Sequence, residues 1–84
     1  MIDMNILEEA IETIKERGSE YGEAKENLGM TAVMWSIILD TDVTAEDVCK
    51  CMIALKLMRW CETSNHDTIL DIIGYAALGN EVNK

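Results

Sequence analysis

The sequence predicts an all-α fold, a four-helix bundle-like single domain over residues 1–84 that assembles as an oligomer. Three observations predict it. The chain contains no Pro and only 5 Gly, apolar residues recur at three- and four-residue spacing, and two helix-capping patterns interrupt them. A chain of this length buries only about 60% of the surface that its unfolded form exposes, so we expect a second copy to complete the core.

The first expected helix begins after Asp3, whose carboxylate is suited to capping a helix N-terminus. Its apolar stripe continues through Gly18 and Tyr21, and Gly22 marks a break or bend. Acidic residues and Lys15 occupy the other face. The helical spacing is carried by Ile6, Leu7, Ala10, Ile11 and Ile14.

The second expected helix covers residues 23–39 and ends at a loop of residues 40–43. Asn27 and Gly29 weaken its first turns, so a start nearer Met30 stays open. One apolar face is formed by Leu28, Ala32, Trp35 and Leu39, and it is broadened by Met30, Met34, Ile37 and Ile38. On this stripe Trp35 is expected in the core.

The third expected helix covers residues 45–61 and opens with a capping box. In it, Thr44 is the N-cap and the Asp47 side chain, in the first turn, bonds back to the cap. It is apolar nearly all round, which is typical of a central helix or of one shared with a partner subunit. Lys50 has the most solvent-like position, whereas Lys56 and Arg59 lie among apolar residues.

The fourth expected helix follows a second capping-box pattern, residues 64–67, and extends to Leu78. At 100° per residue, Asp67, Asp71, Gly74, Tyr75 and Leu78 fall on one face, opposite Ile69, Ile72, Ile73 and Ala76. An antiparallel hairpin with the third helix places Asp71 level with Lys56, and Asp67 level with Arg59.

These four charges in an apolar setting allow two interpretations, because a charge there is costly unless matched. In the first, Asp71 forms an ion pair with Lys56, while Asp67 both caps the fourth helix and pairs with Arg59. In the second, Asp67 and Asp71 hold Mg²⁺ while Lys56 and Arg59 bind phosphates. An acidic residue from another helix then completes the metal site, and the candidates are Glu8, Glu9, Glu12, Glu46 and Asp47.

The net charge and the cysteines limit which binding partners and which cellular compartment we expect. The net charge of −9 repels phosphate backbones, so we expect no nucleic acid. The sequence shows neither a signal-peptide pattern nor an apolar run that spans a bilayer, which predicts a cytoplasmic protein with no membrane partner. Its three cysteines, Cys49, Cys51 and Cys61, lack zinc-site spacing and are expected as buried, reduced thiols.

The closing segments, residues 55–59 and 66–78, resemble the closing hairpin of small phage and prophage MazG-like proteins. More of the chain resembles one uncharacterised phage-borne branch of them, through residues 16–22, Asn27, Trp35-Ser36 and Asp47-Val48. The resemblance implies an all-α, usually oligomeric protein whose active relatives use Mg²⁺ to hydrolyse nucleoside triphosphates to monophosphate and pyrophosphate. Their motif is EExxE on one helix and ExxD on the next. Glu8-Glu9-x-x-Glu12 matches its first half, whereas Asp67-x-x-x-Asp71 comes three helices later.

Arg17, Tyr21 and Asn27 are the remaining candidate ligand-binding residues. They are suited to grip a phosphate, stack on a base and read its edge, or else to tie the end of the first helix to the hairpin. Two functions therefore stay open. One is nucleotide binding by a host-cytoplasmic phage protein with Mg²⁺-dependent pyrophosphohydrolase activity; the other is a non-catalytic phage protein that sequesters a nucleotide-like signal or binds a host protein. No catalytic residue is assigned.

Overall fold

Four α-helices make up the regular structure of the described chain, so the all-α prediction is confirmed. The computed structural model describes residues 2–21 and 24–83, and the side chains of 2–17 and 25–83. The helices are α1 (Asn5–Tyr21), α2 (Ala24–Leu39), α3 (Ala45–Glu62) and α4 (His66–Val82). Within the described ranges, no helix is long and apolar enough to cross a membrane.

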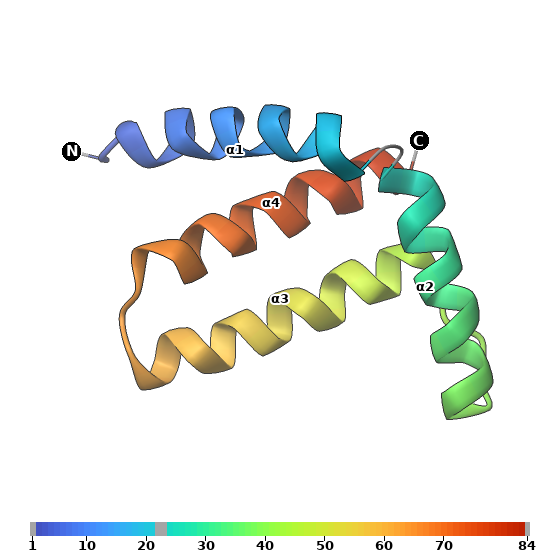
Figure 1. Cartoon of the computed structure of the whole chain (residues 1–84). Coiled ribbons are helices and arrows are strands. Elements are labelled where there is room, and N and C mark those ends of the chain that lie inside the picture. Colours follow the sequence, from blue (N-terminus) through green and yellow to red (C-terminus); the bar gives the residue numbers. More distant parts are fainter. Residues whose placement is uncertain (1, 22–23, 84) are drawn as a thin grey trace.

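The central helix is α4, which contacts the other three. In Figure 1, α1 and α3 lie on either side of α4, and α2 crosses the end of this layer. Of the two alternatives expected for α3, the central position is wrong, since among the described residues α3 contacts α2 and α4 but not α1; a helix shared with a partner subunit stays a prediction. Leu55 and Met58 of α3 are 47% and 63% exposed. Periodicity reports that these residues are apolar, but it does not report whether a neighbouring helix covers them.

The ends of α1 and α2 follow local backbone chemistry. The Asp3 carboxylate accepts a hydrogen bond of 2.9 Å from the Asn5 N–H, as the sequence predicted. Helix α2 begins at Ala24 rather than near Met30. It ends at Leu39. The next residue, Asp40, has a left-handed φ of 54°, and the Thr41 N–H donates to the Ser36 carbonyl at 3.2 Å. This is the Schellman arrangement, which satisfies a carbonyl that the helix end leaves free.

The capping box of α3 is confirmed, whereas the cap of α4 differs by one residue. The Asp47 N–H donates to the Thr44 hydroxyl at 3.1 Å, and the Thr44 N–H donates to the Asp47 carboxylate at 3.0 Å. These hydrogen bonds to Thr44 lower the pKa of Asp47. At α4 the cap is Asn65, whose side chain accepts from the Asp67 N–H at 2.8 Å. An amide oxygen caps as well as a hydroxyl, so residue types alone do not choose between Asn65 and its neighbour.

The core is small. Among the described residues, the fully buried apolar side chains are Ala10, Ala32, Val48 and Cys49. Burial raises the pKa of the Cys49 thiol, which fits the expected structural role. The expected burial is wrong for Cys51 and Cys61, which are exposed free thiols. Among the described residues, no helix covers the side of α3 on which they lie.

Candidate functional site

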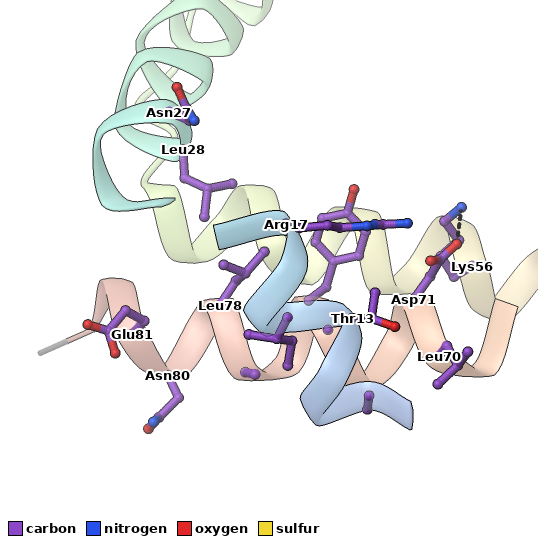
Figure 2. Close-up of a pocket in the computed structure, with 15 residues that line it drawn as sticks. Thr13, Arg17, Asn27, Leu28, Lys56, Leu70, Asp71, Leu78, Asn80 and Glu81 are labelled. Atoms are coloured by element: carbon purple, nitrogen blue, oxygen red, sulfur yellow. Dashed lines mark ion pairs between the residues drawn. The ribbon is translucent and has the colours of Figure 1, made fainter. Parts of the chain in front are cut away.

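An open pocket of about 850 Å³ lies along α4 between α1 and the start of α2. Its size is typical of small-molecule sites, about 300–1,000 Å³. Figure 2 shows side chains from all four helices around it. The polar side chains that line it are Thr13, Arg17, Asn27, Lys56, Asp71, Tyr75, Asn80 and Glu81.

One end of the pocket carries an ion pair between α3 and α4. The Lys56 ammonium lies 2.9 Å from an Asp71 carboxylate oxygen, and the two side chains are 18% and 27% exposed. Figure 2 marks this pair with a dashed line. The predicted register of the hairpin is therefore confirmed for Asp71 and Lys56. Partial burial makes each charge dependent on the other, because a half-buried charge without a partner is costly.

Arg17 provides a second cation on the pocket wall. It lies one turn before the end of α1, and Figure 2 shows its guanidinium pointing along the pocket toward the end that holds Lys56 and Asp71. The part of the chain that the structure describes offers Arg17 no ion-pair partner. A guanidinium presents planar, paired donors that match phosphate and carboxylate oxygens. On the pocket wall, such a group is suited to bind an anionic ligand.

The other end of the pocket is polar but mostly uncharged. Asn27 comes from α2, and Asn80 and Glu81 come from the last turns of α4. Asn80 and Glu81 were not predicted as site residues, because the predicted fourth helix ended at Leu78. From Asp71 to Glu81 the helix rises about 15 Å, so these two lining residues lie well apart along the pocket.

The floor between the two ends is apolar and leaves room for a ligand. It is formed mainly by Ala10, Ile14, Leu70, Ala77 and Leu78. Gly74 lies in the same floor, one turn after Asp71, and a Cβ built on it meets no atom within 4 Å. An apolar floor beside a few polar groups is the usual composition of a small-molecule site.

Asp67, the other predicted metal ligand, lies outside this pocket. It lines a shallower groove between α1 and the start of α4, which also contains Glu8, Glu9, Glu12 and His66. His66 contacts the Glu9 carboxylate across this groove. That contact raises the pKa of His66, with smaller contributions from Asp67 and Asp3.

The predicted Mg²⁺ site of Asp67, Asp71 and a third acidic side chain stays a prediction, and the described side chains do not gather these protein ligands in one place. Over these residues, no three His, Cys, Asp or Glu side chains gather closely enough to hold a metal ion. Asp67 and Asp71 line different pockets, although one helical turn separates them on α4. The Asp71 carboxylate pairs with Lys56 of α3, whereas Asp67 lines the groove beside acidic side chains of α1.

Only some of the predicted ligand-binding residues lie together in one pocket. Arg17, Asn27 and Lys56 line one pocket together with Asp71. Arg59 is exposed and does not line that pocket, and no ion pair joins it to Asp67 among the described residues. Tyr21 ends α1, and its side chain lies outside the described residues.

Comparisons with known proteins lead to a phage family. A family model described as "Domain of unknown function (DUF6378)" matches residues 5–83. The "Gene 55 protein" of Mycobacterium phage L5 is 42% identical over 78 residues, which is 89% of this chain and 50% of that relative. The "Gene 55 protein" of Mycobacterium phage D29 is 38% identical over 74 residues, or 86% and 49% of the two chains.

The chain therefore spans about half the length of the curated relatives that it matches. No solved structure matches it. The expectation of a phage-borne family is confirmed by these relatives, while the resemblance to MazG-like enzymes stays a prediction.

Proposed function

The chain belongs to the DUF6378 family and is homologous to the mycobacteriophage gene 55 proteins; from that premise we propose that it binds a nucleotide or nucleotide-like phosphorylated molecule in the pocket along α4. Arg17 and Lys56 bind the phosphates. The base and sugar lie on the apolar floor near Gly74, and Asn27 supplies an amide that reads a polar edge. The resemblance to MazG-like proteins favours this ligand class.

One observation carries the proposal. Three residues chosen from sequence as ligand-binding candidates, Arg17, Asn27 and Lys56, come from three different helices and line a single pocket. Arg17 contributes a guanidinium with no ion pair among the described residues. Phosphate binding by such a group is charge-assisted and bidentate, which makes it stronger than a neutral hydrogen bond.

A second candidate function is Mg²⁺-dependent hydrolysis of the bound nucleotide to monophosphate and pyrophosphate. What favours it is the charge of the pocket, where the cations Arg17 and Lys56 are balanced by the carboxylates Asp71 and Glu81. A polyphosphate adds negative charge, and Mg²⁺ that arrives on the phosphates offsets it. Mg²⁺ in proteins is often held by one or two carboxylates plus substrate phosphates, and Asp71 would serve as the protein ligand.

The alternative is binding without turnover, in which the phage protein sequesters a nucleotide-like signal or masks a host protein. The Lys56–Asp71 pair supports this alternative, because it already gives Asp71 a partner at 2.9 Å. The two functions differ in their need for metal and in whether a product forms.

The test is an incubation of excess protein with mixed nucleotides and Mg²⁺, followed by ultrafiltration and chromatography of the filtrate. Selective depletion of one nucleotide without product supports binding. New monophosphate and pyrophosphate that vanish with a chelator support hydrolysis, and Asp71→Asn should then abolish turnover while circular dichroism stays unchanged. A filtrate identical to the protein-free control would contradict the proposal for nucleotides.

Matched variants locate the ligand. We expect Arg17→Gln to weaken binding of the depleted nucleotide by about tenfold or more, because one charge-assisted phosphate contact is lost. Arg59→Gln is the control, since Arg59 is exposed and outside the pocket. Calorimetric titration measures both affinities. Equal losses in the two variants would contradict the assignment of the ligand to this pocket.

A further inference from the structure

We propose that the outer face of α2 is the interface between two copies of this chain in a symmetric homodimer. This face is defined by Met30, Val33, Met34, Ile37 and Ile38. Their spacing of three, four and seven residues puts them on one side of the helix, opposite the buried Ala32.

The face is fully apolar and uncovered. Its five side chains are 71%, 61%, 56%, 69% and 69% exposed, in chain order. The sequence carries no charged residue between Glu26 and Asp40, so the helix lacks the polar outer side that a surface helix normally has. A contiguous apolar face of this kind on a small protein marks an interaction site.

The chain exposes more surface and is less compact than a typical monomer of its mass. The chain exposes 6336 Å², whereas a monomer of 9.4 kDa exposes about 5,000 Å². This excess of roughly 1,300 Å² is spread over the whole chain, and it is large enough to include the roughly 800 Å² that each partner of a standard interface buries. The radius of gyration of 13.8 Å also exceeds the roughly 12 Å of a compact chain of this length.

The chemistry of the face fits a second copy of itself. A two-fold axis brings the same patch of each copy together, so the patch must be self-complementary. A row of apolar side chains at helical spacing meets this requirement, since its ridges pack into the grooves of an identical helix. The charges that give each copy its net −9 lie off this face, and the two copies therefore approach without like-charge contacts across it.

Sedimentation equilibrium of the nucleotide-free full chain tests the dimer independently of the proposed ligand. Wild type should sediment at twice 9.4 kDa at high concentration and dissociate on dilution. Met34→Lys should raise the dimer Kd by about thirtyfold or more, although it reduces the net negative charge. Met58→Lys is the matched control, because Met58 is 63% exposed on α3 and Met34 is 56% exposed on α2.

A second measurement needs no variant. In hydrogen exchange of wild type at low and high concentration, amides of residues 30–38 should become at least several-fold more protected at high concentration, while those of α1 keep their rates. A monomer at all concentrations would overturn the proposal. A dimer that Met58→Lys disrupts and Met34→Lys leaves intact, or concentration-dependent protection confined to other helices, would also overturn it.

Discussion

At the scale of single residues, the contact between His66 and Glu9 is a pH-sensitive feature. It joins α1 to the first turn of α4 at the rim of the acidic groove. Hydrogen bonding to the Glu9 carboxylate is the largest cause of the raised pKa of His66, followed by the charge of Glu9. The favourable contact therefore depends on the protonated imidazole.

The pH dependence follows from the sign of this shift. Since the pKa of His66 is raised above its ordinary 6.5 in the folded chain, the contact contributes fully at pH values below 6.5 and is lost as the pH rises through the folded value. We expect an NMR titration of His66, the single histidine, to report this raised pKa. Glu9→Gln should return the pKa toward 6.5.

Glu12→Gln is the control for that titration, because Glu12 lines the same groove and is not among the causes of the shift. If Glu9→Gln and Glu12→Gln changed the pKa of His66 equally, the general negative charge of the groove would explain the shift. The specific contact to Glu9 would then have no role.

At the scale of secondary structure elements, the two most informative positions are glycines inside helices. Gly74 in α4 and Gly29 in α2 each leave open space where a Cβ would be, with no atom within 4 Å. A helical glycine costs stability relative to alanine because its backbone loses more freedom on folding. Nothing in the packing requires either glycine, whereas at Gly74 the open space belongs to the candidate pocket.

We expect Gly74→Ala and Gly29→Ala each to raise the free energy of unfolding by up to about 1 kcal/mol. Urea denaturation at fixed protein concentration measures this. A larger side chain separates the two positions, because Gly74→Leu fills the pocket and should abolish ligand binding, whereas Gly29→Leu lies outside the pocket lining and should not. A destabilising Gly74→Ala would show that the helix needs glycine at that position for packing.

At the scale of the whole molecule, α3 and α4 pack against each other most extensively, and α1 packs least against the other helices. The α3 and α4 helices pack along their lengths, while α1 touches mainly α4 and part of α2. Leu7, Ile11 and Ile14 of α1 are 41%, 53% and 40% exposed, so this helix buries little apolar surface. Since local opening depends on buried contacts, α1 should open before the hairpin does.

Native-state hydrogen exchange measures this order. At a single concentration, amides of α1 should exchange faster than those in the middle of α3 and α4, and ligand in the pocket should slow α1 because Arg17 and Ile14 line it. Uniform exchange across all four helices would show instead that the chain unfolds as one unit.

The sequence by itself determined the four helices, most of their boundaries and the hairpin register that pairs Lys56 with Asp71. These features depend on local periodicity, on capping chemistry and on one short loop, all of which are written in consecutive residues. It also selected Arg17, Asn27 and Lys56, although it did not show that they line one pocket.

Only the tertiary structure decided which helix is central, where Asp67 and Arg59 point, and which apolar faces stay uncovered. It placed α4 in the middle and left the outer faces of α2 and α3 exposed. It also moved Asp67 into a different groove from Asp71. These features depend on crossing angles and on contacts between residues far apart in the chain, and a helical repeat carries the same apolar pattern whether a neighbouring helix covers it or not.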